Sequence, residues 1–302
     1  MIDKYIISGS IRIHYLDYPG GEPTVVLLPG LTANAHIFDG LIEAGLSPPF
    51  HVLALDLRGR GKSDAPPAGF DPATPAANYT MADHAADVIG FLEGLDIHHP
   101  VLVGHSFGGM LALYLAAHFP ERFPRIVVLD WAMALMTPAT RELLKPTLAR
   151  LRQIAPSWEV YLTAVKQMPF YHGWWDPMIE RFYRSDILEN SDGSVQPRSR
   201  PDAIQAALEG TLIEDWPALL AQVRQPVLLL NARDPFGPPG AAPLLPGDRA
   251  RATVEALANV RYVAVPGNHI TMLFGHNAQR VVEAMTAFLR EGDDDVHSLG
   301  RS

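Results

Sequence analysis

The sequence contains no cysteine, and this absence excludes several kinds of protein at once. The 302-residue chain can form no disulfide, offers no thiolate to a metal ion and has no cysteine nucleophile. Long apolar runs are missing too, since no stretch approaches the roughly 20 residues that a transmembrane helix needs. Hydrophobic residues nevertheless make up 48% of the chain. We therefore expect a globular protein with a large packed core.

Positive charge is also in short supply. The chain has 24 Lys and Arg residues against 33 Asp and Glu residues, which gives a formal net charge of −9. This balance argues against a nucleic-acid-binding surface and against a basic membrane-binding patch. The opening residues, MIDKYIISGSIRIHYLDY, lack a basic start followed by an apolar segment, so we expect no secretory signal. The sequence thus predicts a cytoplasmic monomer or homodimer with neither a nucleic acid nor a membrane as partner.

Strand and helix patterns alternate in both outer parts of the chain. This alternation predicts an α/β fold with a doubly wound, mostly parallel sheet, preceded by an edge hairpin. The expected strands cover residues 5–7, 11–18, 24–28, 51–55, 101–103, 125–129, 226–231 and 260–265. A capping box at Thr80 and Asp83 predicts a helix start between the fourth and fifth of these strands.

The middle of the chain differs from the two ends. It has long helical patterns, no good buried strand, a polar loop near residues 191–200 and all five tryptophans. We therefore expect a discontinuous core with an inserted helical cap and a disordered C-terminal tail. The expected limits are residues 1–130 and 222–290 for the core, 131–221 for the cap and 291–302 for the tail.

One glycine-rich stretch carries the first sign of chemistry. The sequence Gly104-His105-Ser106-Phe107-Gly108 stands between an apolar β-type run and a helical pattern. A nucleophile elbow needs this context, because its serine occupies a strained turn that lifts the hydroxyl off the sheet. Side chains at the two outer positions would collide where strand and helix converge, so glycine is required there. Ser106 is therefore the candidate nucleophile, and His105 is interpreted as a packing residue.

Two further polar residues follow later strands. Asp234 comes after the expected strand at 226–231, and His269 comes after the strand at 260–265. In open α/β sheets ligands bind at the carboxyl ends of the strands, and the chain order Ser, acid, His suits this architecture. Asp130 also ends a strand, so it is the alternative acid. The sequence predicts a triad of Ser106, His269 and Asp234, in which Asp234 orients His269 as the base.

Five motifs, taken together, indicate a resemblance to a known protein family. They are LLPGLTANAHIF, ALDLRGRGKSD, VGHSFGGM, LLLNARDP and VPGNHITM, in this order. With these motifs the chain resembles the α/β-hydrolase fold superfamily of serine hydrolases with a helical cap, and the resemblance implies an eight-stranded core sheet. It also implies an oxyanion hole made by the backbone N–H groups of Leu31 and Phe107. Relatives often have His-Gly where this chain has Pro29-Gly30, so the bracing of that loop is open.

The expected activity is hydrolysis of a small to medium, largely apolar carboxylic ester through an acyl-enzyme, with no cofactor and no metal. C–C bond hydrolysis of ring-cleavage products or lactone hydrolysis on the same triad is the alternative, and a non-catalytic ligand receptor is a third. A C–C hydrolase needs a cation for its dienoate substrate, for which Arg58 and Arg181 are candidates. The expected substrate pocket is lined by Trp131, Met136, Met168 and Trp174.

Overall fold

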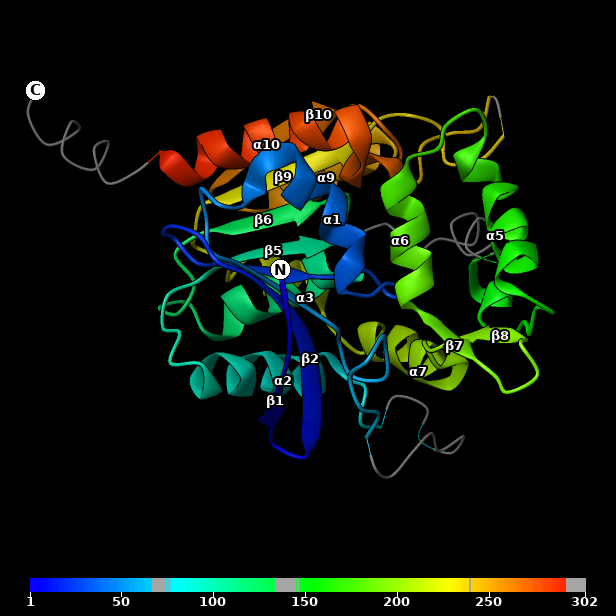
Figure 1. Ribbon diagram of the computed structural model, residues 1–302. Helices are drawn as coiled ribbons and strands as arrows, with labels where there is room; N and C mark the ends of the chain where they lie inside the picture. Colours follow the sequence, from blue (N-terminus) through cyan, green and yellow to red (C-terminus); the bar gives the residue numbers. More distant parts are fainter. Residues whose placement is uncertain (67–73, 75–76, 134–144, 146, 239, 292–302) are drawn as a thin grey trace, which may run out of the picture.

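A single mixed sheet forms the core of the computed structural model, which describes residues 1–66, 74, 77–133, 145, 147–238 and 240–291 (Figure 1). Its strands are β1 (Ile2–Ser8), β2 (Ile11–Tyr18), β3 (Val25–Leu28), β4 (Val52–Leu55), β5 (Val101–His105), β6 (Ile126–Leu129), β9 (Val227–Ala232) and β10 (Val260–Val265). They lie in the order β1-β2-β4-β3-β5-β6-β9-β10. β1 and β2 run antiparallel to their neighbours, and the rest of the sheet is parallel. The predicted fold class and all eight predicted strands are confirmed.

Helices cover both faces of this sheet. The helices of at least eight residues with described bounds are α2 (Met81–Gly94), α3 (Phe107–His118), α5 (Trp158–Lys166), α6 (Pro177–Ser185), α7 (Pro201–Thr211), α9 (Gly247–Ala256) and α10 (Gly275–Arg290). Shorter helical turns are η1 (Ala35–Phe38), α1 (Asp39–Leu41), η2 (Ile42–Leu46), η3 (Pro169–Tyr171), α8 (Trp216–Leu220) and η4 (Thr271–Leu273). Every residue of β3, β4, β5, β6 and β9 is buried, as expected for strands covered on both faces. None of the helices in the described ranges is long and apolar enough to cross a membrane.

The inserted segment lies at one end of the sheet. Figure 1 shows α5, α6 and α7 gathered beyond the carboxyl ends of β5 and β6. The segment also contains a small antiparallel hairpin, β7 (Ile187–Glu189) and β8 (Val195–Pro197), and β8 lies within the stretch 191–200 for which a polar loop was expected. Three-residue strands with a polar turn between them carry too little apolar alternation to stand out. The limits of the cap stay a prediction, and of the expected tail at 291–302 all but residue 291 lies outside the described residues.

The elbow glycines are required because the backbone approaches itself closely. A Cβ added to Gly108 would lie 1.9 Å from the Leu28 carbonyl oxygen, and one added to Gly104 would lie 2.0 Å from the Gly108 carbonyl oxygen. Neither obstacle is a side chain that can rotate away. The steric prediction for both positions is therefore confirmed, and it fixes the close crossing of α3 over β3 and β5.

We expect Gly108→Ala to destabilise the fold by more than about 3 kcal/mol, because the added methyl group meets backbone rather than a movable side chain. Gly109→Ala is the matched control, since the nearest atoms to its Cβ would be Val128 Cγ1 at 3.1 Å and the Gly104 carbonyl oxygen at 3.2 Å, both more than 1 Å farther away than the obstacle at Gly108. That variant should stay within about 1 kcal/mol of the native protein, helped by the higher helix propensity of alanine. Urea unfolding of both variants measures the difference, and equal midpoints would contradict the steric explanation.

Candidate active site

Ser106 occupies a strained turn between β5 and α3. Its backbone angles are φ 53° and ψ −116°, in a region that non-glycine residues rarely adopt. The side chain does not cap the helix that begins at the next residue. Its hydroxyl is therefore not used to stabilise α3, and Ser106 lines a cavity together with His269.

His269 lies in the loop after β10, where Asp130 meets it. The Nδ1 atom of His269 is 2.7 Å from Oδ2 of Asp130, and both side chains are buried. The other carboxylate oxygen, Oδ1, accepts hydrogen bonds from Asn231 Nδ2 and from the Ala232 N–H, each at 2.8 Å. Because Nδ1 donates to the carboxylate, Nε2 of a neutral His269 is left free to accept a proton.

The expectation that Asp234 orients His269 is wrong, and Asp130, the alternative acid, takes that place. Asp234 is exposed, and its Oδ2 accepts the Gly267 N–H at 2.7 Å. It therefore stabilises the turn that precedes the histidine without contacting the imidazole. The physical reason is register: β9 ends at Ala232 beside Asp130, and Asp234 lies two residues beyond the sheet.

The two residues expected to form the oxyanion hole line the same cavity as Ser106. Phe107 is the first residue of α3, so its N–H has no acceptor within the helix, and Leu31 follows Gly30 in the loop after β3. The Gly30 carbonyl accepts the Ala33 N–H at 3.1 Å. In a trans peptide the N–H points opposite to the C=O, so this bond also fixes the direction of the Leu31 N–H. Both residues line the cavity that contains Ser106.

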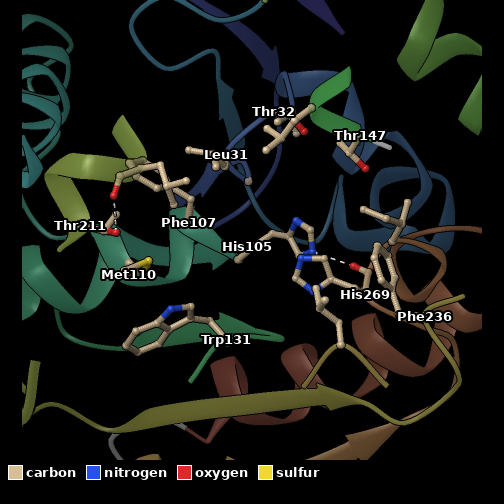
Figure 2. Close-up of a pocket in the computed structure, with 17 residues that line it drawn as sticks. Leu31, Thr32, His105, Phe107, Met110, Trp131, Thr147, Thr211, Phe236 and His269 are labelled. Carbon is tan, nitrogen blue, oxygen red and sulfur yellow. Dashed lines mark hydrogen bonds between the residues drawn. The ribbon is translucent and has the colours of Figure 1, made fainter. Parts of the chain in front are cut away.

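His105 has a larger role in the site than packing. Its Nε2 donates to the carbonyl oxygen of His269 at 2.8 Å, and the two rings lie 4.6 Å apart between centroids. Figure 2 shows the two histidines side by side at the centre of the pocket. Burial and the neighbouring His269 hold the pKa of His105 well below its ordinary value, so this residue is neutral. His105 thus connects the turn at Ser106 to the loop that carries His269.

The cavity is mostly apolar and has a volume of about 90 Å³. Ser106, His105, His269, Leu31 and Phe107 all line it. Figure 2 also shows Met110, Trp131, Thr211, Phe236, Thr32 and Thr147 around it.

Of the expected pocket residues, Trp131 lines the cavity and Met136 lies outside the described residues. Trp174 lines a separate hollow with Asp234 and His276, and Met168 is not part of the wall. Met110 was missed, although it lies one helical turn after Ser106 on the same face of α3.

The described part of the cavity wall contains no Asp, Glu, Lys or Arg residue, and of its two histidines His105 is neutral. Arg58 is buried elsewhere and forms a two-point ion pair with Asp87, with N···O distances of 2.6 and 2.7 Å. Arg181 contacts Asp39 at 3.1 Å. Neither candidate cation therefore reaches the site. Among the described residues no group of three or more His, Asp or Glu side chains is placed to hold a metal ion.

Comparison with known proteins agrees with this geometry. The family model of the alpha/beta hydrolase fold matches residues 23–275. The 2-(acetamidomethylene)succinate hydrolase of Mesorhizobium japonicum is 33% identical over 138 residues, 46% of each chain. The N-formylmaleamate deformylase of Pseudomonas putida is 36% identical over 127 residues, 41% of this chain and 43% of the relative. The matched stretch thus spans just under half of these curated relatives.

A solved structure shows the same fold over almost the whole chain. The crystal structure of E-2-(acetamidomethylene)succinate hydrolase superposes with a TM-score of 0.80, at 23% identity, over 95% of this chain and 98% of that one. At this identity the likeness bears on architecture alone, including the eight-stranded sheet and the helical insertion.

Proposed function

The chain belongs to the alpha/beta hydrolase fold family, and from this membership and the site geometry we propose that it is a serine hydrolase of small to medium, largely apolar carboxylic esters. The observation that carries the proposal is the arrangement of three side chains at one edge of the sheet. Ser106 and His269 line one cavity, and Asp130 binds the far side of His269 at 2.7 Å. Each member has the environment that its role requires.

The proposed reaction begins with the Ser106 hydroxyl, which is a weak nucleophile unless a base removes its proton. His269 Nε2 accepts that proton while Oγ attacks the ester carbonyl carbon, and the resulting oxyanion faces the N–H groups of Leu31 and Phe107. The carbonyl re-forms, the bond to the alcohol breaks, and His269 returns the proton to the leaving oxygen. Asp130 stays ionised and stabilises the imidazolium that forms between these steps.

The second half of the reaction repeats these steps with water. His269 takes a proton from a water molecule, whose oxygen attacks the acyl carbon on Ser106. The tetrahedral intermediate collapses, the acid leaves, and Oγ recovers its proton. Each donor of the oxyanion hole is worth about 2.7 to 4 kcal/mol in comparable sites, because the charge develops only in the transition state.

The cavity wall supports a neutral acyl group. Transfer of a carboxylate out of water without a partner costs several kcal/mol, and no described residue of the wall is a cation. The relatives named above act, by their names, on a succinate and a maleamate. We propose that this chain differs from them in taking an uncharged acyl chain, and the volume of about 90 Å³ favours a short one.

A matched pair of esters tests the proposed preference. We expect kcat/KM for p-nitrophenyl pentanoate to exceed that for mono-p-nitrophenyl glutarate by at least about 100-fold, because the two acyl chains have equal length and only the second carries a carboxylate. A series from acetate to decanoate should reach its maximum at six carbons or fewer. The Ser106→Ala variant supplies the blank for spontaneous hydrolysis. Equal rates for the pair would contradict the neutral pocket, and turnover of lactones or ring-cleavage products alone would favour the alternative activities.

A further inference from the structure

Arg60 is a charged side chain with 0% of its surface exposed. Its Nε donates to the Leu31 carbonyl oxygen at 3.1 Å, and Nη1 donates to the Arg58 carbonyl oxygen at 2.8 Å. Nη1 also contacts His84 Nε2 at 2.7 Å, whereas Nη2 has no hydrogen-bond partner in the described structure. No carboxylate within the described residues forms an ion pair with this guanidinium.

His84 leaves the charge of Arg60 uncompensated. Its Nδ1 donates to the Thr80 carbonyl oxygen at 2.8 Å, so Nε2 is the acceptor that faces Arg60. Burial, reinforced by Arg60, keeps the pKa of His84 well below its ordinary value. Burial also lowers the pKa of Arg60 to about 9, which still leaves the guanidinium protonated at neutral pH. A full positive charge therefore lies inside the protein beside a neutral imidazole.

Arg58, two residues earlier on the same loop, makes the contrast clear. It is buried as well, but its Nε and Nη2 atoms both donate hydrogen bonds to the Asp87 carboxylate. A buried ion that lacks such a partner lowers the stability of the folded state. Among the described residues a carboxylate thus pairs with Arg58 and none pairs with Arg60, so Arg60 requires a different explanation.

The contacts of Arg60 point to that explanation. Besides bonding to Leu31, its guanidinium carbon lies 5.2 Å from the centre of the Phe107 ring. His84 packs edge-on against the same ring at 5.0 Å. Leu31 and Phe107 come from separate loops, after β3 and after β5. Arg60 thus contacts both residues of the proposed oxyanion hole from behind, without lining the cavity itself.

We propose that Arg60 is a positioning residue of the oxyanion hole, which holds Leu31 and Phe107 together and places a fixed positive charge behind their N–H groups. The inference rests on the proposed function. A buried charge is not screened by solvent, and it stabilises a negative charge that appears on the substrate only in the tetrahedral state. It acts on the transition state more than on the neutral ester, so it raises kcat and leaves KM nearly unchanged.

Three variants test this role by steady-state kinetics, with active sites counted by fluorophosphonate titration. In Arg60→Gln we expect kcat to fall by about 30-fold with KM within threefold, since charge and bridge are both lost. The affinity for an alkyl boronic acid, which forms a tetrahedral anionic adduct on Ser106, should fall by the same factor. Arg60→Lys keeps the charge but not the bridge, so its kcat should lie between those of Arg60→Gln and the native protein. Arg58→Gln is the matched control and should lose thermal stability while keeping kcat within threefold.

The outcomes separate the two proposals. Native protein that neither turns over esters nor reacts with fluorophosphonate would overturn the proposed function, and the Arg60 inference with it. Active native protein together with an Arg60→Gln variant that keeps its kcat and its boronate affinity would overturn the inference alone. A rise in the KM of Arg60→Gln in proportion to its loss of kcat would also overturn the inference alone. If Arg60→Gln fails to fold, Arg60→Lys decides, because a kcat equal to that of the native protein would exclude the bridging role.

Discussion

Replacement of Ser106 by alanine is expected to lower kcat by on the order of 10⁶-fold, as loss of the nucleophile does in comparable triads. The change removes one oxygen that neither caps α3 nor supports the turn, so the fold should persist. Initial rates on p-nitrophenyl butyrate measure the loss of activity. Circular dichroism measures retention of the fold, and labelling by a fluorophosphonate reports the reactive hydroxyl directly.

Ser185→Ala is the control for this experiment. Its hydroxyl donates to the Phe182 carbonyl oxygen at 2.7 Å in the cap, outside the cavity wall. This variant should retain both turnover and labelling. Labelling that survives in Ser106→Ala would show that another residue is the nucleophile, and the proposed function would then fail.

Replacement of Asp130 by asparagine is expected to reduce kcat by about 10⁴-fold. The amide NH₂ group cannot accept the Nδ1 proton of His269, so the imidazole is driven to the tautomer that carries its proton at Nε2 and cannot act as base. The same variant also weakens the bonds that Oδ1 accepts from Asn231 and Ala232. The geometry should survive, because both side chains have nearly the same shape.

Asp234→Asn is the matched comparison, since it makes the same chemical change at the other strand end. Its new amide oxygen still accepts the Gly267 N–H, so we expect kcat to remain within about tenfold of the native value. The kcat of each variant under saturating ester measures the ranking. If Asp234→Asn is the more damaged enzyme, the assignment of the acid from the structure is wrong.

The fold and the elbow could be predicted because they depend on local patterns. Buried parallel strands appear as short apolar runs, the Thr80–Asp83 capping box is formed as expected, and Gly104 and Gly108 are explained by steric contacts between neighbouring segments. The sequence patterns of these elements are local, although the contact that requires glycine at position 108 is with the distant Leu28. The strand count of the core sheet and the expected position of Ser106 at a strand end therefore agree with the structure.

The sequence alone could not decide which aspartate contacts His269, because two strands that are each followed by an aspartate end at the same edge of the sheet. β6 and β9 are adjacent and parallel, with Leu129 opposite Leu230, so Asp130 and Asp234 were both plausible from sequence. What separates them is the three-dimensional placement of His269, which depends on the turn at Gly267 and on the docking of β10. The bridging role of Arg60 was equally invisible, because it connects loops that lie far apart in the chain.

The pocket was the least predictable part for a similar reason. Aromatic residues concentrated in the insertion suggested that the cap supplies the wall. The segment 131–221 does supply part of it, including Trp131, but Met110, Phe236 and Leu244 come from the core and its loops. Trp174 contributes to the hollow beside Asp234 instead. Composition reports that apolar side chains are present, whereas their direction is set by tertiary packing.

The chain order of the triad has a consequence for how the protein is made. Ser106 and Asp130 directly follow the neighbouring strands β5 and β6, whereas His269 follows β10, which comes after the other described strands of this sheet in chain order and lies at its edge. A chain that ends before β10 still contains the segments of the elbow, but it lacks the histidine that would take the proton of Ser106. Under the proposed function, the chain therefore gains the base that activates Ser106 only once β10 has docked on β9.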